Sequence, residues 1–223
     1  MKRIILGVAI IVLNVITVFA QKKINEGIIT YKVEWQPAPQ MQQFAAMFPK
    51  EVTVYFKGDS AVTVVKAPFF NSNTIVNAKT EYQRLLLDMP MRNKKFSVIF
   101  TPDDIEQMKE HGPEFSMATT TENKVLNGYK AIKSTITEKK SGKTADGWFT
   151  NDIEIPQNSL TIFFNKSAGF PLEFSSFQSG MGLKATVADI KETAVPVGIF
   201  SATKDYEEIT FAQLMAMMGG GNR

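Results

Sequence analysis

The chain has 223 residues, with 25 Lys and Arg against 22 Asp and Glu, a single histidine and no cysteine. This length suits one domain with a sizeable core. The near balance of charge, with lysines alternating with acids, lacks the basic footprint of a nucleic-acid-binding protein, so we expect no nucleic acid partner. Without cysteine there are no disulfides and no lipid attached through an N-terminal cysteine, so stability must come from packing alone.

The first 20 residues are typical of a secretory signal peptide. Lys2 and Arg3 precede an apolar run over residues 4–19, which ends in the cleavage pattern Val-Phe-Ala at 18–20. The alternative is an uncleaved N-terminal anchor, but the run is interrupted by polar residues and is short for a membrane span, which needs about 20 apolar residues. We therefore expect export through the Sec pathway, to the periplasm, to an association with the outer membrane, or out of the cell.

Alternation of apolar and polar residues dominates the chain after this segment. In residues 27–35 the apolar side chains fall on every second position, as in a half-buried strand. Residues 51–66 repeat the pattern on both sides of Gly58-Asp59, which predicts a hairpin. Further strands are predicted at 73–78, 82–89, 95–100, 115–123, 129–139, 145–150, 171–178 and 183–192. Short strands at this spacing predict a mainly β fold built on a large antiparallel sheet or barrel.

Two short helical patterns are rich in methionine and phenylalanine. The first covers residues 39–48 and stops at Pro49, and the second covers 211–218 after a capping box formed by Thr210 and Gln213. The whole chain holds 11 Met and 17 Phe. Methionine is flexible and polarizable and lines surfaces that accept variable apolar partners. The alternative is a core in which short helices simply cover one side of the sheet.

A third helix is predicted at 102–111. Thr101 is its N-cap, Asp104 stands three residues later, and Gly112 ends it. The single histidine, His111, falls in the last turn, where an imidazolium interacts favourably with free carbonyl groups. A catalytic triad or a His-based metal site would have to use this residue. With no cysteine beside it, a structural zinc site is excluded.

Asp152 and Glu154 are the one carboxylate pair with a spacing that chemistry can use. Alternate positions on a strand lie about 7 Å apart on one face, as a glycosidase can require. The sequence shows neither aromatic residues around the pair on which a sugar could stack nor a third polar residue to assist catalysis. A hydrolase is therefore the weakest of the functions considered. We therefore expect no enzyme activity, no metal and no cofactor.

Several short motifs resemble those of the exported family called domain of unknown function 4412. They are Gly128-Tyr129, Trp148-Phe149-Thr150, the segment Gly-Phe-Pro-Leu-Glu at 169–173 and the Met-rich tail at 214–220. The resemblance spans most of the chain after residue 20 and is densest from Leu126 onward. That family is similar to the periplasmic lipoprotein-carrier (LolA-like) superfamily.

The resemblance implies a curved, half-open antiparallel β-barrel with short helices covering its concave face. Together with the signal peptide expected at 1–20 and a Gly-rich tail at 219–223 whose composition predicts disorder, it gives a single β-rich LolA-like domain at 21–218. It also implies a binding or carrier role, and it supplies no catalytic residues.

Two functions remain open from the sequence. The first is a non-catalytic envelope protein that binds an apolar ligand, a lipid or acyl chain, in the half-barrel cavity. The second is a structural or protein-interaction module of the cell envelope that has a protein partner and no small ligand. The candidate cavity residues are the apolar side chains of two strands and the two Met-rich helices: Trp35, Met41, Phe44, Met47, Phe48, Trp148, Phe211, Leu214, Met215 and Met218.

Processing gives the first testable prediction. We expect the mature protein to begin at Gln21, because Ala20 ends the cleavage pattern that follows the apolar run. The intact mass of protein recovered from the envelope fraction measures this directly. A mass that retains residues 1–20 would indicate an N-terminal anchor instead.

Overall fold

A computed structural model describes residues 21–37, 39–178 and 181–217. The predicted signal peptide, the Gly-rich tail and Met218 lie outside these ranges. Twelve strands form one sheet in the order β14-β7-β6-β5-β4-β3-β2-β13-β12-β10-β9-β8, and β1 pairs with β11 in a separate two-stranded sheet. The strands of the large sheet are β2 (Glu26–Gln36), β3 (Glu51–Lys57), β4 (Ser60–Ala67), β5 (Phe70–Asn77), β6 (Tyr82–Met89), β7 (Lys94–Ile99), β8 (Phe115–Leu126), β9 (Tyr129–Glu138), β10 (Thr144–Thr150), β12 (Phe170–Gln178), β13 (Met181–Glu192) and β14 (Glu207–Glu208).

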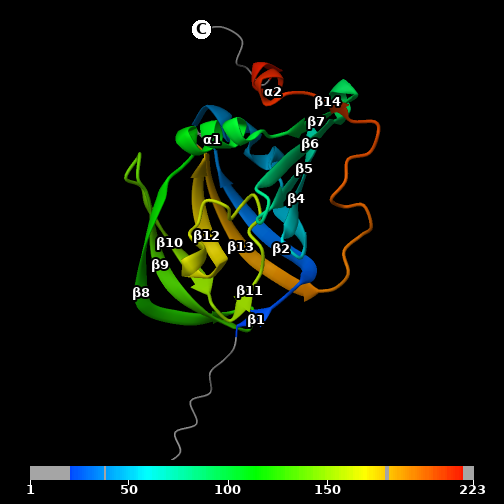
Figure 1. Cartoon of the computed structure of the whole chain (residues 1–223). Coiled ribbons are helices and arrows are strands. Elements are labelled where there is room, and N and C mark those ends of the chain that lie inside the picture. Colours follow the sequence, from blue (N-terminus) through cyan, green and yellow to red (C-terminus); the bar gives the residue numbers. More distant parts are fainter. Residues whose placement is uncertain (1–20, 38, 179–180, 218–223) are drawn as a thin grey trace, which may run out of the picture.

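The large sheet consists of two meanders joined in the middle. Strands β2 to β7 follow one another in space as in sequence, and so do strands β8 to β13, while β2 pairs with β13 to join the two series. All neighbours are antiparallel except β14, which runs parallel to β7. The sheet curves strongly and does not close (Figure 1). The predicted mainly β fold and half-open barrel are confirmed.

The predicted elements are present with small differences. Each strand expected from alternation is found, whereas β1 (Lys22–Lys23), β11 (Ile153–Glu154) and β14 were not predicted, since two residues carry no alternation. The helical segment before β3 is a 3-10 helix, η1 (Pro39–Met47). The two other predicted helices are α1 (Pro102–His111) and α2 (Phe211–Met217), and both capping boxes are confirmed by hydrogen bonds. Two further 3-10 turns are η2 (Pro90–Arg92) and η3 (Lys166–Ala168).

The concave face of the sheet holds the main hydrophobic core. Along β2 the side chains of Ile29, Tyr31 and Val33 are buried, whereas Lys32 and Glu34 between them are exposed. Buried and exposed side chains thus alternate, as they do in a strand that has one buried face. The buried rows of β3, β9, β12 and β13 continue the same cluster across the curve of the sheet.

The segment between β11 and β12, residues 155–169, lies inside this curve, and we call it the interior loop. Figure 1 shows it in yellow within the bend of the sheet. The ring of Phe164 packs against those of Phe115, Phe149 and Phe174, with centroid separations of 5.5, 5.7 and 5.1 Å. Gly169, at φ 91°, ends the loop where any side chain would meet the carbonyl oxygen of Thr150. The chain thus fills part of its own concave face.

Helix α1 spans the open side of the half-barrel, because it connects β7 with β8 at the opposite edge of the sheet. Its C-terminal end is held by the turn that joins β9 to β10. Lys140 Nζ donates hydrogen bonds to the carbonyl oxygens of Glu110 (2.6 Å) and Gly112 (2.9 Å). A lysine at this position satisfies free carbonyl groups and interacts favourably with the helix dipole.

The carboxylate of Glu138 orders the same turn. It accepts hydrogen bonds from the backbone N–H groups of Lys140 (3.1 Å) and Ser141 (2.6 Å). Hydrogen bonding by Ser141, more than by Lys140, holds the pKa of Glu138 below its usual range. The charged form of Glu138 therefore fixes the turn from which Lys140 reaches α1.

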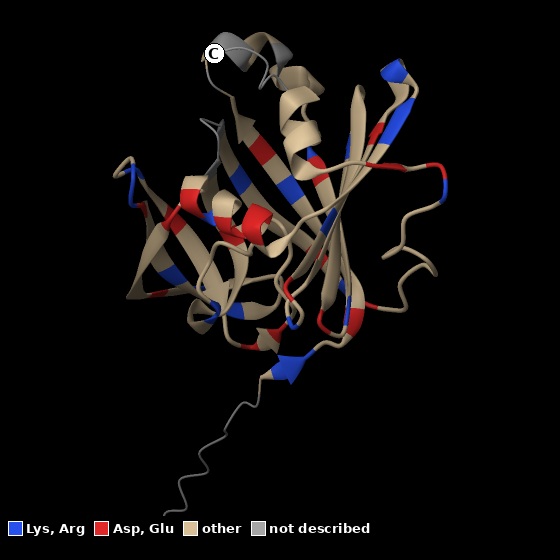
Figure 2. Cartoon of the chain, turned by 45° about the horizontal axis from the view of Figure 1, so that its top comes forward, with Lys and Arg blue, Asp and Glu red and all other residues tan. Residues whose placement is uncertain are grey.

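The convex face of β4 to β6 is covered by residues 193–206, which we call the C-terminal strap. Val62, Ile75 and Leu86 of the strands form a second cluster beneath Phe200 and Tyr206 of the strap. Elsewhere, charges of both signs are interspersed along the strands (Figure 2). Strands β4 to β6 therefore carry buried side chains on their convex face as well.

The packing of the interior loop gives a prediction of stability. Phe164 is 5% exposed and Ile162, in the same loop, is 36% exposed. We expect Phe164→Ala to lower the free energy of unfolding by about 3–5 kcal/mol, because it leaves a cavity among packed rings. The control, Ile162→Ala, is expected to cost under about 1 kcal/mol. Urea unfolding measures both; equal, small losses would show that the loop does not belong to the core.

Candidate functional site

Two adjoining pockets lie beside the interior loop. The first has a volume of about 320 Å³ and the second about 240 Å³. Ala78, Gln157 and Lys166 line both, so the two spaces meet along these residues. Ligand sites in proteins range from roughly 300 to 1,000 Å³. Together the pockets form the candidate site.

The first pocket has an apolar floor and a polar rim. Its apolar lining comes from the β1–β11 pair, the interior loop and the start of β12, and it includes Ile24, Ile153, Ile155, Phe164 and Phe170, all buried. Its polar lining includes Lys23 and Glu154, which form an ion pair of 3.8 Å between themselves. An apolar interior with a few polar groups at the edge suits a ligand that has both kinds of surface.

The floor depends on the first residues of the described chain. Lys22 N donates to Asp152 O (2.8 Å) and Ile24 N donates to Glu154 O (3.1 Å), so this segment runs beside β11. Gln21 Nε2 adds a hydrogen bond of 2.9 Å to Ile153 O. These bonds seat Ile24 beneath the pocket.

The interior loop is ordered by its own polar side chains. Gln157 Nε2 donates to Phe164 O (2.8 Å), Asn158 N donates to Thr161 Oγ1 (3.0 Å), and Leu160 N donates to Asn158 Oδ1 (2.9 Å). Asn and Thr side chains commonly fix turns in this way by bonding to nearby backbone groups. Gln157 thereby lines both pockets with its amide already engaged.

Four buried polar atoms in the described part of the chain have no hydrogen-bond partner: Tyr31 OH, Thr63 Oγ1, Asn158 Nδ2 and Ser176 Oγ. Burial raises the pKa of Tyr31, which keeps its hydroxyl protonated at every physiological pH. Buried polar groups are usually hydrogen-bonded, and leaving one unpaired costs about 1–3 kcal/mol. The interior therefore contains free hydrogen-bonding groups among its aromatic rings.

The sequence-predicted cavity residues do not gather at these pockets. Trp35 lies on the concave side of β2, stacks on Phe48 at 5.4 Å and donates from Nε1 to Pro49 O (2.7 Å). Met47, at the end of η1, is partly exposed. The side chains of Met41 and Phe44, like Met218, lie outside what the structure describes. These contacts fix the end of η1 against β2.

Helix α2 packs at the other end of the same meander, against β7. Phe211 contacts Phe100, just beyond β7, at 5.5 Å, and Leu214 is 4% exposed. Met215 and Met217 are about half exposed, at 49% and 46%. Helix α2 contacts β7 and η1 contacts β2, strands that are separated by four others in the sheet. None of the described candidate residues lines either pocket.

Trp148 points to the convex face of β10, where it still packs against the main core cluster, and it lines neither pocket. It alternates along β10 with Phe149, whose ring packs on Phe164 inside the curve. Lys124 Nζ stands 4.1 Å from the centre of the Trp148 ring and 3.5 Å from Glu173 Oε2. The alternation of β10 allowed only one of these two aromatic residues to face the core.

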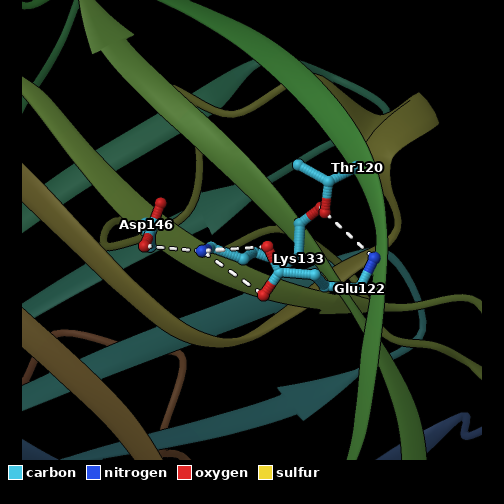
Figure 3. A network of polar contacts seen from close by, with 4 residues as sticks. All are labelled: Thr120, Glu122, Lys133 and Asp146. Atoms are coloured by element: carbon cyan, nitrogen blue, oxygen red, sulfur yellow. Dashed lines mark hydrogen bonds and ion pairs between the residues drawn. The ribbon is translucent and has the colours of Figure 1, made fainter.

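An ion-pair network extends over the same convex surface (Figure 3). Lys133 Nζ lies 3.1 Å from Asp146 Oδ2 and 3.4 Å from Glu122 Oε1, and Glu122 N donates to Thr120 Oγ1. Hydrogen bonding by Asp146, followed by that by Glu122, raises the pKa of Lys133. Each charged group of the network already has a partner of opposite sign, so the network is explained by its role in holding the strands together.

The predicted carboxylate pair is divided between different partners. Asp152 Oδ2 accepts a hydrogen bond from Lys130 N (2.7 Å), whereas Glu154 forms its ion pair with Lys23. Within the described ranges, no three His, Asp or Glu side chains gather as a metal site requires. His111 is exposed at the end of α1.

Comparisons with known proteins identify a similar fold but no family. No family model matches the chain, and no curated protein matches it. A solved structure of PNGF-II is similar, with a TM-score of 0.52 and 14% sequence identity over 86% of this chain. The match spans only 33% of the PNGF-II chain. At this identity the likeness shows the fold alone, and the resemblance to domain of unknown function 4412 stays a prediction.

In the part of the chain that the structure describes, no helix has the length and apolar character needed to cross a membrane.

The contact of Lys140 with α1 gives a test of how the open side is held. We expect Lys140→Gln to accelerate hydrogen exchange at the amides of residues 107–112 about two- to fivefold, because it removes the cation from the helix end. The matched control is Lys139→Gln, since Lys139 forms its ion pair with Glu114 rather than with the helix. Mass-spectrometric hydrogen exchange compares the two variants. Equal exchange in both would show that Lys140 does not hold the helix.

Proposed function

We propose that the protein is a non-catalytic binding protein of the cell envelope that holds an apolar ligand, such as a lipid or acyl chain, in the half-barrel. The observation that carries this proposal is the pair of adjoining pockets between the interior loop and the sheet. The first pocket is lined by five buried apolar side chains, and polar side chains, among them Thr161 and Gln157, complete its lining. An alkyl chain gains about 0.8 kcal/mol for each CH₂ group that it buries in such a space.

The architecture supports a carrier in a second way. The pocket walls belong to different segments, namely the sheet, the interior loop and α1, and the last of these is fastened by exposed contacts of Lys140. Elements that are held by few exposed hydrogen bonds open at low free-energy cost. A ligand can therefore enter beneath α1 while the strands remain paired.

A specific observation favours the alternative, a structural or protein-interaction module of the envelope with no small ligand. Phe164 and its three neighbouring rings already occupy the centre of the concave face. In addition, Met215 and Met217 of α2 offer exposed, adaptable apolar surface to a protein partner. Under this alternative the two pockets are incidental gaps beside a filled core.

Straight-chain alcohols test the proposal, because they have no charge. Isothermal titration calorimetry with octanol, nonanol and decanol is expected to show affinity rising about fourfold for each added CH₂. Ala78 is exposed in a turn and lines both pockets, so Ala78→Trp is expected to weaken decanol binding at least tenfold by filling the space.

The control is Ala194→Trp, an equally large change at an exposed position that lines neither pocket. It is expected to leave decanol affinity within about twofold of the unchanged protein, and thermal unfolding confirms that both variants fold. If the unchanged protein binds none of the alcohols, the alternative function replaces the proposal.

A further inference from the structure

Two lysines line the second pocket, and one of them also lines the first. Lys109 of α1 lines the second pocket, and Lys166, the first residue of η3, lines both. They come from the two elements that cover the open side of the sheet. Asn165 positions η3 by accepting a hydrogen bond from Ser167 N (3.0 Å). The two cations therefore face one space from different segments of the chain.

Neither lysine has a partner of opposite charge. Among the described residues, the ammonium groups of Lys109 and Lys166 form no ion pair and no hydrogen bond, although Lys23 at the far side of the first pocket is paired with Glu154. Glu81 also lines the second pocket, and it pairs with neither lysine. Asp59, on the rim of the first pocket, forms no ion pair with Lys166. Both lysines are exposed, and within the described residues neither ammonium group is neutralised by an ion pair.

Helix α1 turns its cation toward the pocket and its acids away from it. Ile105 and Lys109 are four residues apart, so they share one face of the helix, and both line the second pocket. The four acidic residues of α1, at positions 103, 104, 106 and 110, line neither pocket. The charge that a bound ligand meets at short range on this helix is therefore positive, although the helix as a whole is acidic.

We propose that the ligand is an anionic amphiphile whose head group binds between Lys109 and Lys166 and whose alkyl chain enters the first pocket. This inference rests on the proposed function and specifies the class of ligand. An ammonium group offers three N–H donors and no acceptor, so a carboxylate or phosphate satisfies it where an alcohol or amine does not. Ile24, Ile153 and Phe170 of the first pocket then cover the chain.

The head group bridges two elements of the cover. Lys109 is carried by α1 and Lys166 by the interior loop, so an anion held by both ties the helix to the loop. A ligand that binds the closed arrangement better than the open one shifts the equilibrium toward closure by its difference in affinity. Binding of the anion therefore slows hydrogen exchange in α1, whereas an uncharged chain of the same length leaves it less changed.

Four ligands with the same ten-carbon chain separate the head group from the tail: decanoate, decyl phosphate, decanol and decylammonium. By calorimetry, decanoate or decyl phosphate is expected to bind about three- to tenfold more tightly than decanol, and decylammonium more weakly. The ratio of the two anions distinguishes a carboxylate ligand from a phosphate ester. Raising the ionic strength is expected to weaken the anions and leave decanol unchanged.

The decisive variant is Lys109→Gln with Lys166→Gln, which keeps polar side chains and removes both charges. It is expected to lose the preference for the anion and to bind decanoate and decanol with equal affinity. The matched control is Lys66→Gln with Lys204→Gln, which makes the same change of net charge at exposed lysines that line neither pocket. This control is expected to keep the preference for the anion.

The outcomes separate this inference from the function on which it rests. Decanol binding without a preference for either anion, or a preference that survives in the Lys109 and Lys166 variant, overturns the inference and leaves the proposed function in place. Tighter binding of decylammonium overturns it as well. If no ten-carbon ligand binds, the inference and the proposed function both fail.

Discussion

An open, curved sheet has an apolar concave face that must be shielded from water, and the burial of Phe164 within that face is the contact on which the described structure depends. A closed barrel would shield this surface by itself, whereas a half-barrel needs a cover from elsewhere in the chain. The interior loop supplies it by placing one ring among three others. Hydrogen bonds within the loop hold this ring in place, and Ile24 belongs to the same core cluster.

This way of covering the sheet also creates the candidate site. A loop that follows the curve of a sheet touches it at some points and leaves gaps at others, because side chains of fixed size cannot match both surfaces everywhere. The first pocket is a gap beside Phe164, the second lies between the loop and α1, and the interior loop borders both. Under the proposed function, packing and binding are coupled. The segment that shields the core also carries Gln157 and Lys166, so the proposed ligand would meet residues of the same loop that packs into the core.

The sequence predicts the strands and helix caps well because both have local causes. Alternation in 27–35 follows from the two faces of a strand, and the capping boxes at Thr101 and Thr210 follow from adjacent backbone groups. The site was not predicted, because the apolar residues of 155–169 do not recur at the spacing of a strand or a helix. The Asn158 and Thr161 side chains indicate a turn, but they do not show that this turn lies inside the curve of the sheet. Alternation also defines two faces without saying which is concave, so the face of β10 to which Trp148 points could not be read from it. Similarly, the Met-rich segments have the spacing of helices, but η1 and α2 pack on strands far apart in the sheet.

The pairing of β2 with β13 has a consequence for how the chain reaches its native state. Each meander is built from hairpins between consecutive strands, and such local pairs form quickly. The middle of the sheet is different, because Ile29 lies opposite Ile190 and the two are far apart in sequence. A chain that emerges from its N-terminus cannot complete this central pair until residue 190 has followed. Until then, β2 presents an unpaired edge and Tyr31 has no Phe174 against it. The slow step of folding is therefore the meeting of two preformed halves, and the incomplete chain is at its most vulnerable to wrong strand pairing just before that step.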